Sequence, residues 1–200
     1  MKKKIFIIGA GGHTNTCIDV IENNKNFKIM FLVDQNIKKN FFKYKVIKEK
    51  EFIKKNIKNK NILIGVGQIK NAKIRKKLFD KYKKFDCKFP NIISKFSYIS
   101  RNSFLTQGIL VSHGAIINAN VKIGLNCIIN SRALIEHDVV VGNHCHISTG
   151  ALVNGGVQIG SSTFIGSGAI LKEGIKIGRN CIIGAGQIIK KDIKANSILK

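Results

Sequence analysis

Two different spacings of apolar positions divide the chain. In residues 1–95, short apolar runs that suit buried strands alternate with stretches of helical spacing. The predicted strands are residues 5–8, 29–33 and 62–64, and the predicted helices are residues 16–22 and 70–84. This alternation predicts a parallel sheet with crossover helices. Pro90, the only proline, lies where this unit is expected to end.

A strict period of six governs residues 96–200. Every sixth residue from Ile99 to Ile189 is Ile, Leu or Val, in all sixteen cases. The sixteen positions are Ile99, Leu105, Val111, Ile117, Ile123, Ile129, Ile135, Val141, Ile147, Val153, Ile159, Ile165, Leu171, Ile177, Ile183 and Ile189. Gly, Asn or Ser often follows the aliphatic residue, which is typical of turns. The segment is therefore an internal repeat.

A period of six fits neither a flat sheet nor an α-helix, but it fits a triangular coil of three hexads. Each side of such a coil contributes one inward aliphatic residue, and stacked coils bury a common core. Sixteen hexads make about five coils. Cys127, Cys145 and Cys181 share a small inward position and differ by multiples of 18 residues, so we expect all three on one side of the core. The isolated coils would leave flat, partly apolar faces, which predicts association into trimers.

Composition narrows the function classes. A chain of 200 residues that is 44% apolar and 23% charged is expected to fold rather than to be disordered. No uncharged apolar run approaches the roughly 18 residues that span a bilayer, so we expect no membrane insertion and a cytoplasmic location. The net charge of +24 is carried mostly by lysines of the first half, with only four Arg and no nucleic-acid-binding motif. We therefore expect no nucleic-acid partner. Five cysteines without a C-x-x-C pair are expected to be reduced thiols.

A glycine-rich turn, Gly9-Ala10-Gly11-Gly12-His13, follows the first predicted strand and opens a helix. Free N–H groups at such a helix start favour phosphate. Asp34 ends the second predicted strand, where folds of this kind often bind a ribose hydroxyl. Thr14 occupies the place of the third glycine of a dinucleotide fingerprint, which disfavours an NAD enzyme. A tight turn without ligand is the simpler alternative.

His137 is the principal candidate for chemistry. With Ile135 inward, Glu136, His137 and Asp138 are expected at an exposed corner of the coil. A carboxylate beside an imidazole fixes its tautomer and stabilises the ring after it takes a proton, which suits a general base. Backbone N–H groups at Gly155-Gly156, one coil above His137, would stabilise an oxyanion. The alternative is a surface histidine without function.

Metal binding by the histidines is a further alternative. His113, His137, His144 and His146 are reminiscent of the zinc-binding, carbonic-anhydrase-like relatives of such a coil. Their spacings do not dictate convergence, and a separate nucleotide-type domain has no place in such a protein. We therefore expect no metal.

Together these motifs resemble the bacterial sugar acetyltransferases of the hexapeptide-repeat class (PglD/NeuD-type), which include UDP-4-amino-sugar N-acetyltransferases and sialic-acid O-acetyltransferases. The resemblance rests on the segments 7–13, 31–34, 64–67, 74–77 and 130–148. It implies an α/β Rossmann-like nucleotide-sugar-binding domain over residues 1–95 and a left-handed parallel β-helix over residues 96–200. It also implies acetyl-CoA as co-substrate and a homotrimer with active sites between subunits.

The resemblance also implies roles for individual residues. They are His137 as general base, Asp138 as its polarising partner, Asn130 for substrate, His146 with Gly155 and Gly156 for the coenzyme, and Gly9, Gly11, Gly12, His13, Asp34 and Gly67 for the nucleotide sugar. The expected reaction is acetylation of the 4-amino group of a nucleotide-linked 4-amino-4,6-dideoxy sugar in bacterial glycan or nonulosonic-acid synthesis. O-acetylation of a sialic acid and a non-catalytic ligand-binding trimer remain alternatives. Relatives usually end in a Gly-x-Pro-Ala-Lys-like tail, whereas this sequence ends in Ser197-Ile198-Leu199-Lys200, which puts coenzyme affinity in question.

Overall fold

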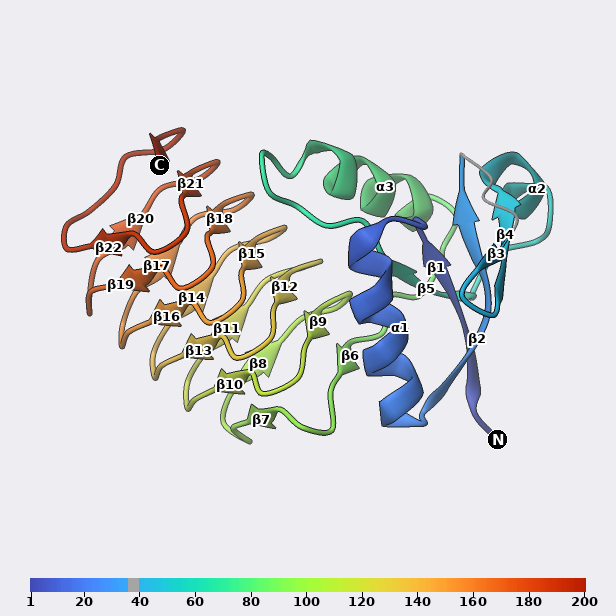
Figure 1. Cartoon of the computed structure of the whole chain (residues 1–200), viewed down its shortest axis with the longest axis horizontal. Coiled ribbons are helices and arrows are strands. Elements are labelled where there is room, and N and C mark those ends of the chain that lie inside the picture. Colours follow the sequence, from blue (N-terminus) through green and yellow to red (C-terminus); the bar gives the residue numbers. More distant parts are fainter. Residues whose placement is uncertain (36–39) are drawn as a thin grey trace.

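A five-stranded sheet forms the centre of the N-terminal domain in the computed structural model, which describes residues 1–35 and 40–200 (Figure 1). Its strands are β1 (Lys3–Ile8), β2 (Phe27–Asp34), β3 (Asn40–Phe41), β4 (Tyr44–Lys48) and β5 (Asn61–Ile64). Their spatial order is β3-β4-β2-β1-β5, and every neighbouring pair is parallel except β3 with β4. The predicted parallel sheet is therefore confirmed.

Helices cover both sides of this sheet. One apolar core joins α1 (Gly12–Asn24) to one side, and another joins α2 (Glu49–Ile53) and α3 (Lys73–Lys83) to the other. Helix α1 begins at Gly12, earlier than the predicted residue 16. The prediction missed the first turn because it consists of glycine and polar residues, which show no apolar spacing. The short elements β3, β4 and α2 were not predicted, since lysines interrupt their apolar pattern.

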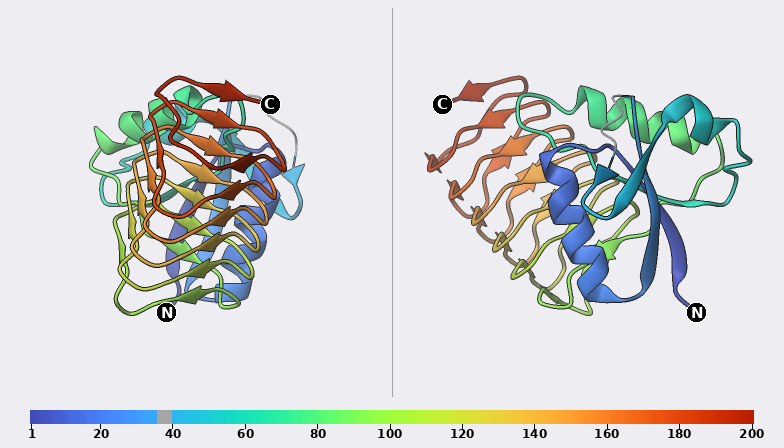
Figure 2. Two further views of the ribbon diagram at one scale, coloured as in Figure 1. Left: turned by 90° about the vertical axis from the view of Figure 1, so that its left-hand side faces the viewer. Right: turned by 45° about the vertical axis from the view of Figure 1, so that its right-hand side comes forward.

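The remaining strands form three parallel sheets, one for each side of a triangular coil (Figure 2). We call these sides the docked face, the apolar face and the third face. The docked face comprises β6 (Ile92–Ile93), β9 (Leu110–Val111), β12 (Ile128–Ile129), β15 (His146–Ile147), β18 (Phe164–Ile165), β21 (Ile182–Ile183) and β23 (Ile198–Leu199). The apolar face comprises β7 (Tyr98–Ile99), β10 (Ile116–Ile117), β13 (Leu134–Ile135), β16 (Leu152–Val153), β19 (Ile170–Leu171) and β22 (Ile188–Ile189). The third face comprises β8 (Phe104–Leu105), β11 (Lys122–Ile123), β14 (Val140–Val141), β17 (Gln158–Ile159) and β20 (Lys176–Ile177).

The second residue of each of these strands from Tyr98 to Ile189 is the repeated aliphatic of the sequence. Most of these side chains are completely buried in one continuous core, and only Ile99 and Leu105 of the first coil are partly open. Register repeats every 18 residues, as in Ile117 opposite Ile135. The predicted β-helix is therefore confirmed. Cys127, Cys145 and Cys181 are buried beside strands of the docked face, so their predicted common side is confirmed too.

The outward residues give each face its own character. On the docked face, Ile92, Leu110 and Ile128 pack with Cys17 and Ile18 of α1. Figure 1 shows α1 between the N-terminal sheet and the coils. Hence the α/β domain covers the first strands of this face, β6, β9 and β12. The first solenoid strand, β6, lies before residue 95, and the exact domain boundary stays a prediction.

The other two faces carry no part of the N-terminal domain among the described residues. The outward residues of the apolar face are Tyr98, Ile116, Leu134, Leu152, Ile170 and Ile188. All six are apolar, and Tyr98 and Ile188 are each 59% exposed. The third face instead alternates Phe104 and Val140 with Lys122, Gln158 and Lys176. A contiguous apolar column of this kind typically marks an interaction surface.

Candidate functional site

His137 lies at the corner between β13 and β14, where the apolar face meets the third face. Its Nδ1 is 2.8 Å from Asp138 Oδ2, and both side chains are more than half exposed. A carboxylate oxygen only accepts hydrogen bonds, so Nδ1 carries the proton. In the neutral ring, Nε2 therefore keeps its lone pair. This is the protonation pattern that a general base requires.

Asp138 is held in place from the coil below. Asn120 Nδ2 donates to Asp138 Oδ1 at 3.2 Å, while Oδ2 accepts from His137. These two hydrogen bonds, first that from His137, hold the pKa of the Asp138 carboxyl below its usual value. The carboxylate thus stays ionised beside the ring. Asn120 was not singled out in the sequence, although its position one coil below Asp138 follows from the 18-residue register.

Gly155, one coil above His137, lies directly against the His137 ring. A Cβ at Gly155 would lie 2.7 Å from His137 Cε1 and 2.8 Å from Nε2, so only glycine leaves room for this ring position. Gly156 N donates to the His137 carbonyl at 2.9 Å. The Gly156 N–H is therefore engaged within the coil. Of the predicted pair, Gly155 is the one whose Cα faces the reactive nitrogen.

The glycine turn and Asp34 meet at the carboxyl ends of β1 and β2, as predicted. Ala10 N donates to Asp34 Oδ2 at 2.7 Å, which fixes the turn. Gly9 has a φ of 114°, a conformation that disfavours other residues. Gly11 and Gly12 are exposed at the start of α1. Their N–H groups and the helix dipole favour an anion there.

A pocket of about 360 Å³ opens beside this turn. Gly9 and Asp34 line it together with seven residues to which no binding role was assigned from the sequence, namely Ile8, Val33, Gln35, Glu49, Val66, Ile74 and Leu78. Glu49 is held by Lys81 Nζ at 2.8 Å and by Tyr82 Oη at 3.0 Å. The pocket thus combines apolar walls with two carboxylates, a composition suited to a nucleoside. The walls come from separate elements, so no single motif marks the whole pocket.

His13, Gly67 and His146 meet where the α/β domain touches the docked face. Gly67 leaves room for His13, since a Cβ there would lie 3.2 Å from His13 Cβ. The rings of His13 and His146 have centroids 6.2 Å apart. His146 Nδ1 donates to the Gln68 carbonyl at 2.6 Å, and Asn130 Nδ2 donates to His146 Nε2 at 3.3 Å. His146 faces outward from the coil as expected, but it is buried beneath the Gln68 segment.

Burial keeps both of these histidines neutral. It lowers the pKa of His13 to about 3, with further lowering by the charges of Arg75 and His146. It lowers the pKa of His146 to about 4, opposed by the bond to Gln68 and assisted by Arg75. His13 Nε2 and the side-chain amide of Gln68 are buried without a hydrogen-bond partner among the described residues. The junction is therefore polar, and its two histidines carry no charge at neutral pH.

The predicted residues consequently fall into two groups. Gly9, Gly11, Gly12, His13, Asp34, Gly67, Asn130 and His146 lie in or beside the α/β domain and the docked face. His137, Asp138, Gly155 and Gly156 lie at the one corner of the coil that the docked face does not share. A single chain thus separates its candidate base from its candidate nucleotide site.

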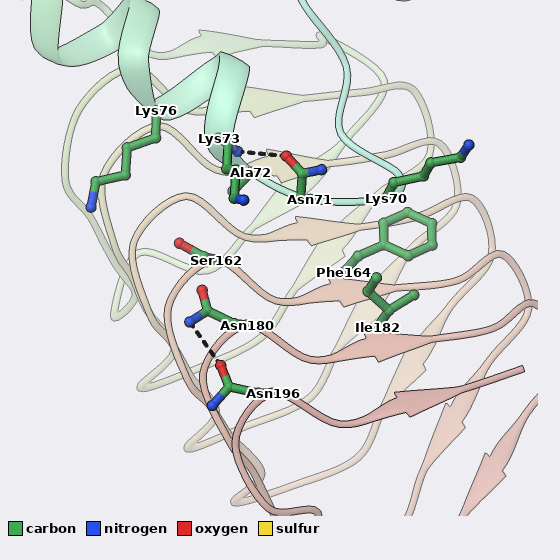
Figure 3. Close-up of a pocket in the computed structure, with 10 residues that line it drawn as sticks. All are labelled: Lys70, Asn71, Ala72, Lys73, Lys76, Ser162, Phe164, Asn180, Ile182 and Asn196. Atoms are coloured by element: carbon green, nitrogen blue, oxygen red, sulfur yellow. Dashed lines mark hydrogen bonds between the residues drawn. The ribbon is translucent and has the colours of Figure 1, made fainter.

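A second pocket of about 360 Å³ lies between the start of α3 and the upper coils (Figure 3). Lys70, Lys73 and Lys76 border it on one side, and Phe164 and Ile182 of the docked face on the other. None of the predicted site residues lines it.

The described parts of the chain contain neither a cluster of metal-ligating side chains nor a disulfide bond. Across residues 1–35 and 40–200, no three His, Cys, Asp or Glu side chains gather as a set of metal ligands. All five cysteines are free thiols. In the same ranges, no helix has the length and apolar character needed to cross a bilayer.

Comparison with known proteins defines the class. Residues 4–82 match the PglD N-terminal domain, and residues 156–189 match the bacterial transferase hexapeptide family (six repeats). The structure is similar to a mutant perosamine N-acetyltransferase from Caulobacter crescentus in complex with CoA and GDP-perosamine, with 26% identity, 98% coverage of this chain, 92% of the other and a TM-score of 0.91.

Two further structures share the fold. They are the acetyltransferase domain of PglB from Neisseria gonorrhoeae in complex with acetyl coenzyme A (24% identity, 99% and 96% coverage, TM-score 0.91) and WeeI from Acinetobacter baumannii (23% identity, 98% and 96% coverage, TM-score 0.88). The chain thus joins a PglD-type N-terminal domain to a hexapeptide transferase domain. The resemblance to the hexapeptide-repeat sugar acetyltransferases drawn from the sequence is confirmed.

The buried histidines predict that acid destabilises the junction. The pKa of His146 falls from 6.5 in the unfolded chain to about 4 on folding, so between these values the unfolded chain binds more protons. The contribution of the neutral ring to the free energy of unfolding is therefore fully present above pH 6.5. It falls as the pH drops, by at most about 1.4 kcal/mol per pH unit for each histidine. Urea denaturation between these pH values measures the slope.

In this test, His146→Asn should show a shallower dependence on pH than the parent protein. Lys122→Asn on the exposed third face is the control and should keep the parental slope. A parental slope in His146→Asn would contradict the assignment of the buried neutral ring.

Proposed function

We propose that this protein is an acetyl-CoA-dependent N-acetyltransferase that acts on the 4-amino group of a nucleotide-linked 4-amino-4,6-dideoxy sugar in bacterial glycan or nonulosonic-acid synthesis. The observation that carries the proposal is the His137–Asp138 hydrogen bond at a coil corner, with Nε2 left as acceptor above Gly155. The perosamine N-acetyltransferase that shares 26% of its residues and nearly the whole fold supports the class of acceptor.

In the proposed reaction, His137 Nε2 accepts a proton from the acceptor amine as its nitrogen forms a bond to the thioester carbonyl carbon. The carbon–sulfur bond then breaks, and His137 returns the proton to the departing thiolate. Asp138 stabilises the imidazolium between these two steps. Gly155 gives the ring its position and brings a backbone N–H close to the developing oxyanion.

The acceptor would bind through the α/β domain. The pocket lined by Gly9 and Asp34 takes the nucleoside, and the exposed N–H groups of Gly11 and Gly12 take the diphosphate. The sugar then extends toward the junction of His13, Gly67, Asn130 and His146. Asn130 and His146 belong to the solenoid side of this junction, and in this proposal His146 supports the coenzyme side of the site.

Such a site requires two copies of the chain. The nucleotide pocket lies on the side of the docked face, whereas His137 lies at the corner opposite that face. The apolar face borders the His137 corner, and its outward column is apolar throughout. Burying this column against another copy would bring His137 of one chain toward the α/β domain of the next, which supports a homotrimer with sites between subunits. We also propose a cytoplasmic location, in keeping with the five free thiols.

Acetylation of a panel of UDP- and GDP-linked 4-amino sugars tests the function, with release of free thiol and the product mass as readouts. A product carrying one acetyl group on nitrogen is expected. His137→Ala should lower kcat by about 10² to 10⁴ at saturating substrates. The control, Arg101→Ala, changes an exposed residue two coils below on the same corner and should leave kcat unchanged.

Two results would contradict this proposal. Unchanged turnover in His137→Ala would show that His137 is not the general base. Acetylation of a sialic acid hydroxyl with no reaction on any amino sugar would show that the acceptor is a sialic acid and not a 4-amino sugar.

The oligomer has its own test. Leu152→Glu places a charge in the apolar column and should dissociate trimers into chains of 22.2 kDa, because burying an unpaired charge is unfavourable. Gln158→Glu, an outward position on the neighbouring third face, is the matched control and should remain trimeric. Light scattering measures the mass, and a monomeric parent protein would refute the intersubunit site.

A further inference from the structure

Arg75 on α3 is completely buried between the two domains, although it is a charged side chain. Its Nη1 donates to the carbonyl oxygens of Ile64 at 2.6 Å and Val66 at 2.9 Å. Its Nε donates to the carbonyl of Asn126 in the solenoid at 3.1 Å. One side chain therefore ties the end of β5 to a corner of the coil.

No carboxylate among residues 1–35 and 40–200 forms an ion pair with this guanidinium. The ion pairs of the described residues do not include Arg75, and its Nη2 is buried without a hydrogen-bond partner. Burial lowers the pKa of Arg75 only to about 10, so the group is still charged at neutral pH. A buried charge without a counter-ion destabilises the fold, which favours a functional reason for its presence.

The segment that Arg75 holds is shared by both parts of the acceptor site. Val66 lines the nucleotide pocket, and Gly67 packs against His13. Gln68, one residue further, accepts the hydrogen bond from His146 Nδ1 that fixes the tautomer of that ring. A shift of the Ile64–Gln68 segment would therefore move a pocket wall and release His146 together.

We propose that Arg75 is a positioning residue for the acceptor: it fixes the Ile64–Gln68 segment between the nucleotide pocket and His146, and its positive charge favours an anionic ligand at the start of α1. This inference rests on the proposed function for its choice of ligand. The β5 end and the glycine turn occupy the same edge of the sheet, as the bond from Gly65 N to the Ile8 carbonyl shows. The guanidinium thus adds positive potential where α1 begins.

Steady-state kinetics of Arg75→Gln and Arg75→Lys test the proposal. In Arg75→Gln we expect the KM of the nucleotide-linked acceptor to rise by about tenfold or more, because the loss of charge-assisted hydrogen bonds to Ile64 and Val66 would release the pocket wall and His146. The KM of acetyl-CoA should stay within about twofold of the parental value, because among the described residues Arg75 makes no hydrogen bond to the His137–Gly155 corner and acts only on the Ile64–Gln68 segment and Asn126. Arg75→Lys keeps the charge and should recover part of the acceptor affinity. Arg179→Gln, an exposed arginine, is the matched control.

Two additional measurements separate the possible failures. Direct titration with UDP and GDP reports nucleotide affinity even if no amino sugar is acetylated, so a loss of binding in Arg75→Gln relative to Arg179→Gln would support Arg75 while the proposed reaction fails. Nitrogen NMR of His146 should show an Nδ1-protonated neutral ring in the parent protein and mixed tautomers in Arg75→Gln. If Arg75→Gln does not fold, Arg75→Lys replaces it: a lysine cannot make all three hydrogen bonds, so the acceptor KM should still rise more than the KM of acetyl-CoA.

An unchanged acceptor KM with unchanged nucleotide affinity would overturn the proposal. Equal increases in the KM of both substrates would overturn it as well, since they would indicate a general structural role.

Discussion

The six-residue period of the solenoid determines where the candidate base lies in this protein. Each hexad supplies one buried aliphatic residue and then turns a corner, so residues six apart belong to different faces while residues 18 apart stack on the same one. Once the α/β domain covers one face, the opposite corner is the place most remote from it. His137 lies at that corner, and its separation from the proposed nucleotide pocket of its own chain is a consequence of the coil geometry.

The two domains also differ in how they treat their titratable groups. At the exposed corner, Asp138 keeps its charge and polarises His137. At the domain junction, burial holds His13 and His146 neutral around the charged Arg75. The first arrangement suits proton transfer, and the second suits the recognition of an anionic ligand without competition from protonated rings. The chain thus separates its candidate base from its candidate acceptor site.

Long-range repetition made much of this structure predictable. The inward column from Ile99 to Ile189, the shared side of the cysteines and the exposed corner at His137 all follow from periodicity, because position in the coil depends only on residue number. The α/β domain offered shorter signals, so its sheet was predicted, while the start of α1 and the element α2 were not. Glu49, Val66 and Gln68 act through tertiary contacts that no sequence spacing identifies, whereas the place of Asn120 below Asp138 follows from the 18-residue register. The roles of His137, His146 and the glycines stay predictions that the geometry supports.

Mixed oligomers test most directly whether one chain supplies the nucleotide site and another supplies the base. His137→Ala and Asp34→Ala are each expected to be inactive alone, but any oligomer that contains both variants holds at least one site with both groups intact. Co-expression of the two chains should therefore restore acetylation, whereas co-expression of His137→Ala with Asp138→Ala should not. Failure of the first pair to regain activity in verified mixed oligomers would contradict the account, because it would place both groups of each site on a single chain.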